Sequence, residues 1–117
     1  MTNDLAIYTV APTDSIRTAM QKIEQNKHRV VVVVDQGKVV GTVSDGDIRR
    51  AFLHNMLAIA PISRIMQLNP HVTTERDPER LAEIIRREQV TVLPIVTEEN
   101  DFVDVVLAYE PFADDAS

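Results

Sequence analysis

Cysteine is absent from this 117-residue sequence, and aromatic residues make up only 4% of it. Without cysteine the chain has no disulfide and no thiolate, which excludes zinc ribbons, iron–sulfur clusters and thiol nucleophiles. The aromatic positions are Tyr8, Phe52, Phe102, Tyr109 and Phe112. Since hydrophobic residues nevertheless reach 44%, the core has to be small and aliphatic.

A secretory signal and a membrane-spanning segment are missing from the sequence as well. The first ten residues include Asp4 and lack the basic start of a signal peptide. No uninterrupted apolar run is longer than Val30–Val34, whereas a spanning helix needs about 20 residues. We therefore expect a cytoplasmic protein that does not enter a membrane.

Positive charge is scarce and unevenly placed. The chain holds 12 Lys and Arg against 18 Asp and Glu, which gives a net charge of −6. Residues 1–58 hold seven basic against six acidic residues, and residues 59–117 hold five against twelve. An acidic chain with no basic, aromatic-rich stripe argues against nucleic-acid binding. An anionic ligand would lie with the first half.

The first half predicts two helices around two strands. Ser15 and its neighbours can cap a helix in which Ile16, Ala19, Met20 and Ile23 share one face, with an end near Asn26. The valine run 30–34 does not alternate with polar residues, which is typical of a strand covered on both faces. Residues 36–37 predict a tight turn, 38–43 a second strand, and 44–45 the cap of a short helix through 53.

The second half repeats this order. Asp77 is a candidate N-cap with Pro78 at the first helical position, 63 residues after Asp14. Residues 90–96 and 102–107 predict two strands, and Pro111 opens a last short segment. We expect two units, residues 1–58 and 59–117, because about 55 residues form only a marginal core alone.

The segment 40–50 combines the residues best suited to bind a ligand. Gly41 allows another group to approach the backbone closely, and Ser44 lies at a helix N-terminus, where free N–H groups and the helix dipole favour anions. Asp47 follows Ser44 by three residues and could accept hydrogen bonds from two vicinal hydroxyls. This combination suits the phosphate and the ribose diol of a nucleotide.

With this motif the chain resembles a tandem pair of CBS domains, also called a Bateman module. The family pattern is an apolar strand, an acidic turn and Gly-x-x-Thr/Ser-x-x-Asp, which residues 31–35, Gly41, Ser44 and Asp47 match in order. The run 46–51 and the connection 61–70 are similar to CBS pairs attached to sugar-phosphate nucleotidyltransferases and arabinose-5-phosphate isomerases. The resemblance extends from residue 7 to about residue 110.

The resemblance implies an α/β (α+β) fold of two β-α-β-β-α units with pseudo-twofold symmetry. It also implies a regulatory module, not an enzyme, that requires no cofactor and binds AMP, ADP, ATP or S-adenosylmethionine between the units. In such modules Asp47 would hold ribose, Ser44 ribose or phosphate, the segment at Tyr8 the base, and Arg29 the phosphates. The expected site residues are Tyr8, Thr9, Val10, Arg29, Gly41, Thr42, Ser44, Asp45 and Asp47.

The second unit departs from this motif. Alignment of residues 101–110 with residues 38–47 places Asp104 at the position of the glycine, Leu107 at that of the serine and Glu110 at that of the aspartate. The hydroxyl and the glycine are lost, and a carboxylate lies near the phosphate position. We therefore expect at most one intact site.

Three alternatives remain at this point. Ser44 and Asp47 could form only a helix cap, in which case the chain is a dimerisation or docking module without ligand. Half of a ferredoxin-like domain that binds an amino acid has a similar element order, but the motif and the repeat argue against it. A stand-alone enzyme lacks support, since no triad, metal cluster or phosphate loop is present. We expect a homodimer, through helices near 51–53 and Pro111, fused to or associated with an enzyme.

Overall fold

The computed structural model describes residues 4–108. Its first unit contains β1 (Thr9–Val10), α1 (Ile16–Asn26), β2 (Val30–Asp35), β3 (Lys38–Ser44) and α2 (Asp45–Leu53). Its second unit contains α3 (Pro78–Glu88), β4 (Val92–Val96) and β5 (Phe102–Leu107). Short 3-10 helices span Leu5–Ile7 and Ile62–Arg64. The predicted mixture of helices and strands is confirmed.

Two small sheets carry the fold. In the first, β2 lies between β1, which runs parallel to it, and β3, which runs antiparallel. In the second, β4 and β5 form an antiparallel hairpin, and Thr73 bridges Ile95 in the parallel direction. This bridge places the segment before α3 beside β4, much as β1 lies beside β2. Within the described residues, the order of a helix followed by two strands therefore occurs twice, each time with a preceding segment paired in parallel.

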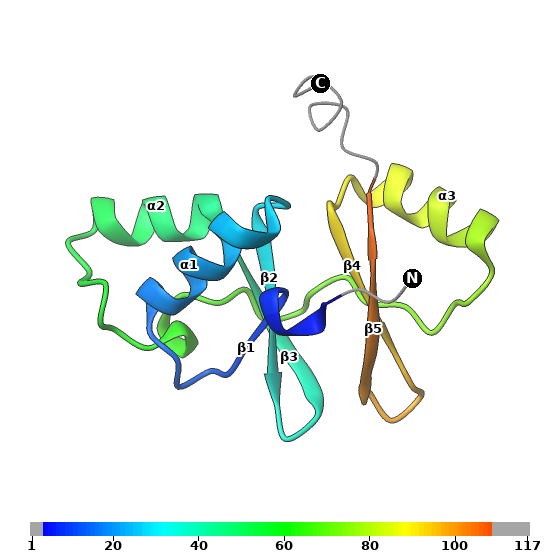
Figure 1. Ribbon diagram of the computed structural model, residues 1–117, viewed down its shortest axis with the longest axis horizontal. Coiled ribbons are helices and arrows are strands. Elements are labelled where there is room, and N and C mark those ends of the chain that lie inside the picture. The colour runs from blue at the N-terminus through cyan, green and yellow to red at the C-terminus, as the bar shows by residue number, and fades with distance from the viewer. Residues whose placement is uncertain (1–3, 109–117) are drawn as a thin grey trace.

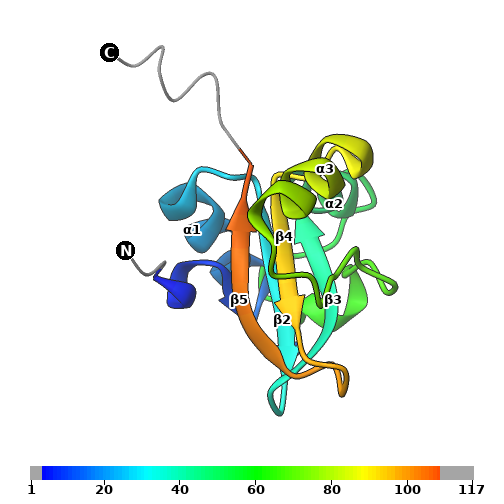
Figure 2. The same ribbon diagram turned by 90° about the vertical axis from the view of Figure 1, so that its right-hand side faces the viewer.

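The two sheets pack face to face, and helices cover their outer faces. Val32 and Val39 of the first sheet share one apolar cluster with Val92, Val96 and Val105 of the second. Helices α1 and α2 lie on the far side of the first sheet and α3 on the far side of the second (Figures 1 and 2). The sheets form the centre of a four-layered arrangement.

The valine strand is covered on both sides, as predicted. Val31 and Val33 belong to the cluster beneath α1 and α2, whereas Val32 faces the second sheet, and all three are fully buried. Alternate side chains of β2 thus pack against two different layers, the helices on one side and the second sheet on the other. A run without polar residues is what such a strand requires.

Local caps explain where the helices begin. The Ser15 hydroxyl accepts a hydrogen bond from the Thr18 N–H at 3.1 Å, and Asp77 caps α3 with Pro78 in the first turn. Both caps agree with the predictions. The second-unit strand begins at Val92, two residues later than predicted.

One core assignment is wrong. Met20 was expected on the buried face of α1, but its side chain is 40% exposed, because the contacts beneath the helix are filled by Ile16, Ala19 and Ile23. Met66 packs against this core with partial burial. The predicted segment at Pro111 lies outside the described residues.

Candidate functional site

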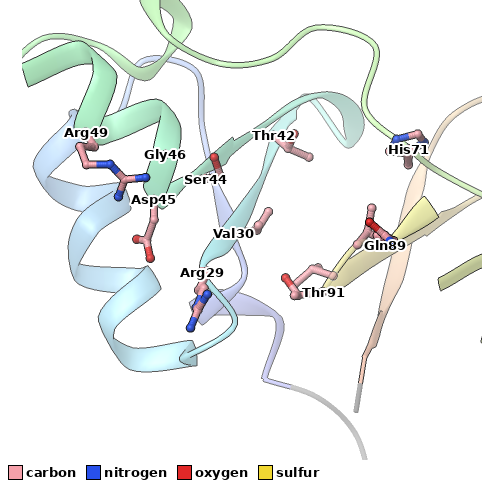
Figure 3. Close-up of a pocket in the computed structure, with 12 residues that line it drawn as sticks. Arg29, Val30, Thr42, Ser44, Asp45, Gly46, Arg49, His71, Gln89 and Thr91 are labelled. Carbon is pink, nitrogen blue, oxygen red and sulfur yellow. The ribbon is translucent and has the colours of Figure 1, made fainter. Parts of the chain in front are cut away.

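A cleft of about 420 Å³ lies where the two units meet. One side, here called the first wall, comes from β2, β3 and the start of α2, and the other, the second wall, comes from the second unit (Figure 3). The first wall consists of Arg29, Val30, Thr42, Ser44, Asp45, Gly46 and Arg49. The second wall consists of His71, Gln89, Val90, Thr91 and Val92.

The first wall is built around the N-terminus of α2. Ser44 leaves β3 in an extended conformation, and its hydroxyl accepts a hydrogen bond from the Asp47 N–H at 3.2 Å. The Asp47 carboxylate in return accepts from the Ser44 N–H at 2.9 Å, which completes a capping box. The positive end of the helix dipole therefore faces the cleft beside the Ser44 hydroxyl.

The first wall also carries more positive than negative charge. Arg29 and Arg49 are exposed and lie on either side of Asp45 in Figure 3. The Asp45 N–H donates to the Arg29 carbonyl oxygen at 3.0 Å, so the strand start and the helix start are held together. Two guanidinium groups, one carboxylate and a helix N-terminus form a surface that favours an anion.

The second wall is less charged and partly apolar. Val90, Thr91 and Val92 offer aliphatic groups, and Gln89 and His71 offer polar ones. His71 Nδ1 lies 3.4 Å from a carboxylate oxygen of Glu88. The Thr91 hydroxyl donates to the His28 carbonyl oxygen at 2.6 Å, which ties this wall to the turn before β2.

The structure brings four of the expected site residues to this cleft, namely Arg29, Thr42, Ser44 and Asp45. It places others elsewhere. Within residues 4–108, Tyr8 and Val10 are buried in the core with 6% and 4% exposure, and neither they nor Thr9 line the cleft. Opposite the first wall, the cleft is lined instead by His71 and by residues 89–92, which lead into β4.

Asp47 lies behind the first wall, with only 5% of its side chain exposed. Besides the bond from Ser44, its Oδ1 accepts hydrogen bonds from Arg50 Nη2 at 2.8 Å and from Gln67 Nε2 at 2.9 Å. Such a buried carboxylate is stable because the guanidinium and the two N–H donors compensate its charge. Asp47 is therefore close to residues that line the cleft but is not itself one of them.

Gly41 performs the role that its residue type predicts, close approach of another group. A Cβ at this position would lie 2.7 Å from the Gln67 carbonyl oxygen. Next to it, Thr42 and Gln67 exchange two backbone hydrogen bonds, at 3.1 and 2.8 Å. Glycine therefore lets the connection between the two units pair with β3.

The sequence analysis did not include the second wall or Arg49 among the expected site residues. The repeat offered an indication, since Thr91 follows Arg29 by 62 residues, one fewer than the 63 that separate Asp77 from Asp14. That register predicts that the two strand starts occupy equivalent places, and the structure gathers both in one cleft. His71 had a comparable indication, because it follows Tyr8 by 63 residues, the distance from Asp14 to Asp77.

The described residues contain neither a metal centre nor a spanning helix. Between Asp4 and Ala108, no group of three or more His, Cys, Asp or Glu side chains is arranged to hold a metal ion. No helix in the same range is long and apolar enough to cross a membrane. The carboxyls of Glu75 and Asp101 have lowered pKa values, and both residues lie outside the cleft.

Comparison with known proteins identifies relatives of the chain. Residues 1–54 match the family model of the CBS domain. The chain is 31% identical over 118 residues to protein MJ1225 of Methanocaldococcus jannaschii, a match that covers 86% of this chain and 42% of that protein. It is 26% identical over 103 residues to arabinose 5-phosphate isomerase KdsD of Francisella tularensis, covering 86% and 32%. The chain thus spans less than half the length of either relative.

The fold has a close counterpart among solved structures. The CBS domain protein PAE2072 from Pyrobaculum aerophilum, solved in complex with AMP, superposes with a TM-score of 0.68 at 22% identity, over 85% of this chain and 78% of that one. Sequence match and fold agree with each other and with the repeat of elements. Residues 1–54 therefore belong to the CBS domain family, and the described residues have the fold of CBS domain structures.

Proposed function

We propose that this chain is a regulatory module that binds an adenine nucleotide in the cleft between its two units. The observation that carries the proposal is the first wall, where Arg29, Arg49 and the N-terminus of α2 border one cavity. Its volume of about 420 Å³ falls within the range of small-molecule sites. Among the described residues that line the cleft, none forms a nucleophile with an adjacent base, which favours binding over catalysis.

Each part of a nucleotide has a suitable partner in this cleft. Phosphate would bind at the start of α2, where Arg29 and Arg49 supply charge and the helix dipole adds to it. Ribose would be held by the Ser44 hydroxyl and by the Asp47 carboxylate. The base would lie between Val30 of the first wall and Val90 and Val92 of the second. We propose one such site per chain, since the matching positions of β5 carry Asp104 and Leu107.

The relatives support both the ligand and the regulatory role. PAE2072, whose fold this chain shares, was solved with AMP. KdsD, the arabinose 5-phosphate isomerase, is more than twice as long as the part that matches this chain. We propose that the module controls an attached or associated enzyme that acts on sugar phosphates, such as a nucleotidyltransferase.

Calorimetric titration with AMP, ADP, ATP and S-adenosylmethionine tests the proposal. At least one of these ligands should bind with one site per chain, and Arg49→Ala should weaken nucleotide binding about tenfold, as expected for one charge-assisted contact. Arg17→Ala is the matched control, since Arg17 is an exposed α1 arginine outside the cleft. Absence of heat with all four ligands would refute the proposal.

A second candidate function, assembly without ligand, has an observation of its own. Exposed apolar side chains gather on α2, on the loop that follows it and on α1, against which α2 packs. Leu53, Leu57 and Ile59 are between 67% and 79% exposed. Large exposed apolar groups favour association with another chain, and here we propose a homodimer.

Sedimentation at micromolar concentration tests this candidate. The wild type should sediment as a dimer, and Leu57→Ser with Ile59→Ser should shift it to a monomer. Leu68→Ser is the control, because Leu68 is 62% exposed but lies in the connection between the units. A wild-type monomer at this concentration would exclude assembly through this exposed apolar surface.

A further inference from the structure

The carboxylate of Asp47 is already satisfied by groups of the chain itself. A carboxylate offers about four acceptor positions. Three of them are used in the described part of the chain, by Ser44 N–H, Arg50 Nη2 and Gln67 Nε2, at 2.9, 2.8 and 2.9 Å. A ribose diol donates two hydrogen bonds, so one of these three donors has to leave before both hydroxyls can bind.

The three donors differ in how readily they leave. The Ser44 N–H belongs to the capping box that begins α2, and its loss would disturb the helix start. Arg50 carries the charge that compensates the buried carboxylate, so its departure would cost more. Gln67 is neutral, and its residue is exposed to solvent. Its amide can therefore replace the hydrogen bond to Asp47 with one to water, without leaving a cavity or an unpaired charge.

The backbone of Gln67 keeps its side chain beside Asp47. Two hydrogen bonds join it to Thr42, which lines the cleft, and Gly41 makes room for its carbonyl oxygen. Gln67 belongs to the connection between the units and stands 20 residues from Asp47. A rotation of the Gln67 side chain would therefore free one acceptor position of the carboxylate, while the connection stays paired with β3.

We propose that Gln67 is an intramolecular competitor of the ligand, which covers the Asp47 carboxylate when the cleft is empty and is displaced by the ribose diol. The proposal rests on the proposed nucleotide function of this cleft. In this proposal Gln67 lowers the affinity of the cleft for the nucleotide. Because Gln67 belongs to the connection between the units, binding of the nucleotide would also change the contacts of that connection.

The test compares AMP with 2′,3′-dideoxyadenosine monophosphate, which lacks both ribose hydroxyls. In Gln67→Ala the Kd for AMP should fall about threefold to tenfold, because the observed affinity scales with the fraction of molecules whose site is open. The Kd for the dideoxy compound should stay unchanged, since it does not compete for Asp47. Gln21→Ala, an exposed glutamine of α1 outside the cleft, should bind both compounds like the wild type.

The outcomes separate this proposal from the function on which it rests. If wild type binds AMP but Gln67→Ala binds it equally or more weakly, Gln67 is not a competitor and the function stands. A gain for the dideoxy compound as large as for AMP would also overturn the proposal, because the effect would not involve the diol. If AMP binds neither protein, the proposed function fails, and this inference with it.

A second readout does not depend on affinity. The side-chain amide signals of Gln67, identified by their loss in Gln67→Ala, should shift in the NMR spectrum when AMP saturates the wild type. Unchanged Gln67 amide signals at saturation would contradict displacement.

Discussion

The hydroxyl of Thr91 donates a hydrogen bond of 2.6 Å to the carbonyl oxygen of His28, 63 residues earlier in the chain. This bond joins the start of the second-unit hairpin to the turn before β2. Since Thr91 lines the second wall and His28 directly precedes Arg29 of the first wall, the bond fixes the two sides of the cleft relative to each other.

Thr91→Val should therefore weaken the junction between the units. The substitution keeps the shape of the side chain but removes the donor, and loss of such a bond costs about 1 kcal/mol of stability. Chemical denaturation would show the loss, and AMP should bind more weakly because the walls are less well held. Thr74→Val, at an exposed position before α3, serves as the control. Equal stability of the two variants would contradict this role for Thr91.

Gly41 and Gly46 should differ in their response to alanine. At Gly41 a Cβ would meet a backbone carbonyl oxygen at 2.7 Å, so Gly41→Ala should cost about 1 to 3 kcal/mol. At Gly46 the nearest atom is the flexible end of Arg50, at 3.3 Å, and alanine is favoured in a helix. Gly46→Ala should therefore leave the free energy of unfolding unchanged or raise it. A loss of equal size in both variants would refute this account of Gly41.

Ser44 should contribute to stability through its cap. Ser44→Ala removes the acceptor for the Asp47 N–H and should cost about 1 kcal/mol. Ser63→Ala, at an exposed position in the 3-10 helix, is the comparison. If denaturation curves of the two variants coincide, the Ser44 cap does not stabilise α2.

The ion pair between Lys38 and Asp101 predicts a dependence on pH. Its atoms lie 2.8 Å apart, and the hydrogen bond from Lys38 holds the pKa of the Asp101 carboxyl below its ordinary value. The pair therefore favours the folded state above the pKa of the unfolded chain, and this contribution disappears as pH falls through the lowered pKa.

Thermal melts of wild type and Asp101→Asn measure this effect. The wild type should melt higher at pH 6, and the two curves should converge as the pH falls below the lowered pKa of Asp101, where the carboxylate is protonated in both states. High salt should reduce the difference at pH 6, because both side chains are about half exposed. A difference that persists at low pH would show that the ion pair is not its origin.

The sequence predicts local features of this fold well and the contacts between distant segments poorly. The caps at Ser15, Ser44 and Asp77 depend only on their neighbours in the chain, so residue type was enough to locate them. The double coverage of the valine strand follows from its composition. Met20 was misplaced because helical spacing does not determine how wide the buried face of a helix is.

The candidate site was half predictable for the same reason. Ser44 and Asp45 lie in one motif, whereas Arg29 was implied only by the resemblance to CBS domain pairs, so part of the first wall could be proposed from the residues. The second wall depends on how the two sheets pack, and the Gln67 contact depends on the path of an irregular connection. Neither is encoded in a local pattern.

The most direct test of nucleotide binding in this cleft is the backbone amide NMR spectrum of the wild type as AMP is added. The proposed site predicts shifts at Gly46 and Arg49 on the first wall and at Thr91 on the second, with Gln21 on α1 and Glu83 on α3 unchanged. If AMP at saturating concentration moves none of the cleft amides, or moves only amides elsewhere, the chain does not bind the nucleotide in this cleft.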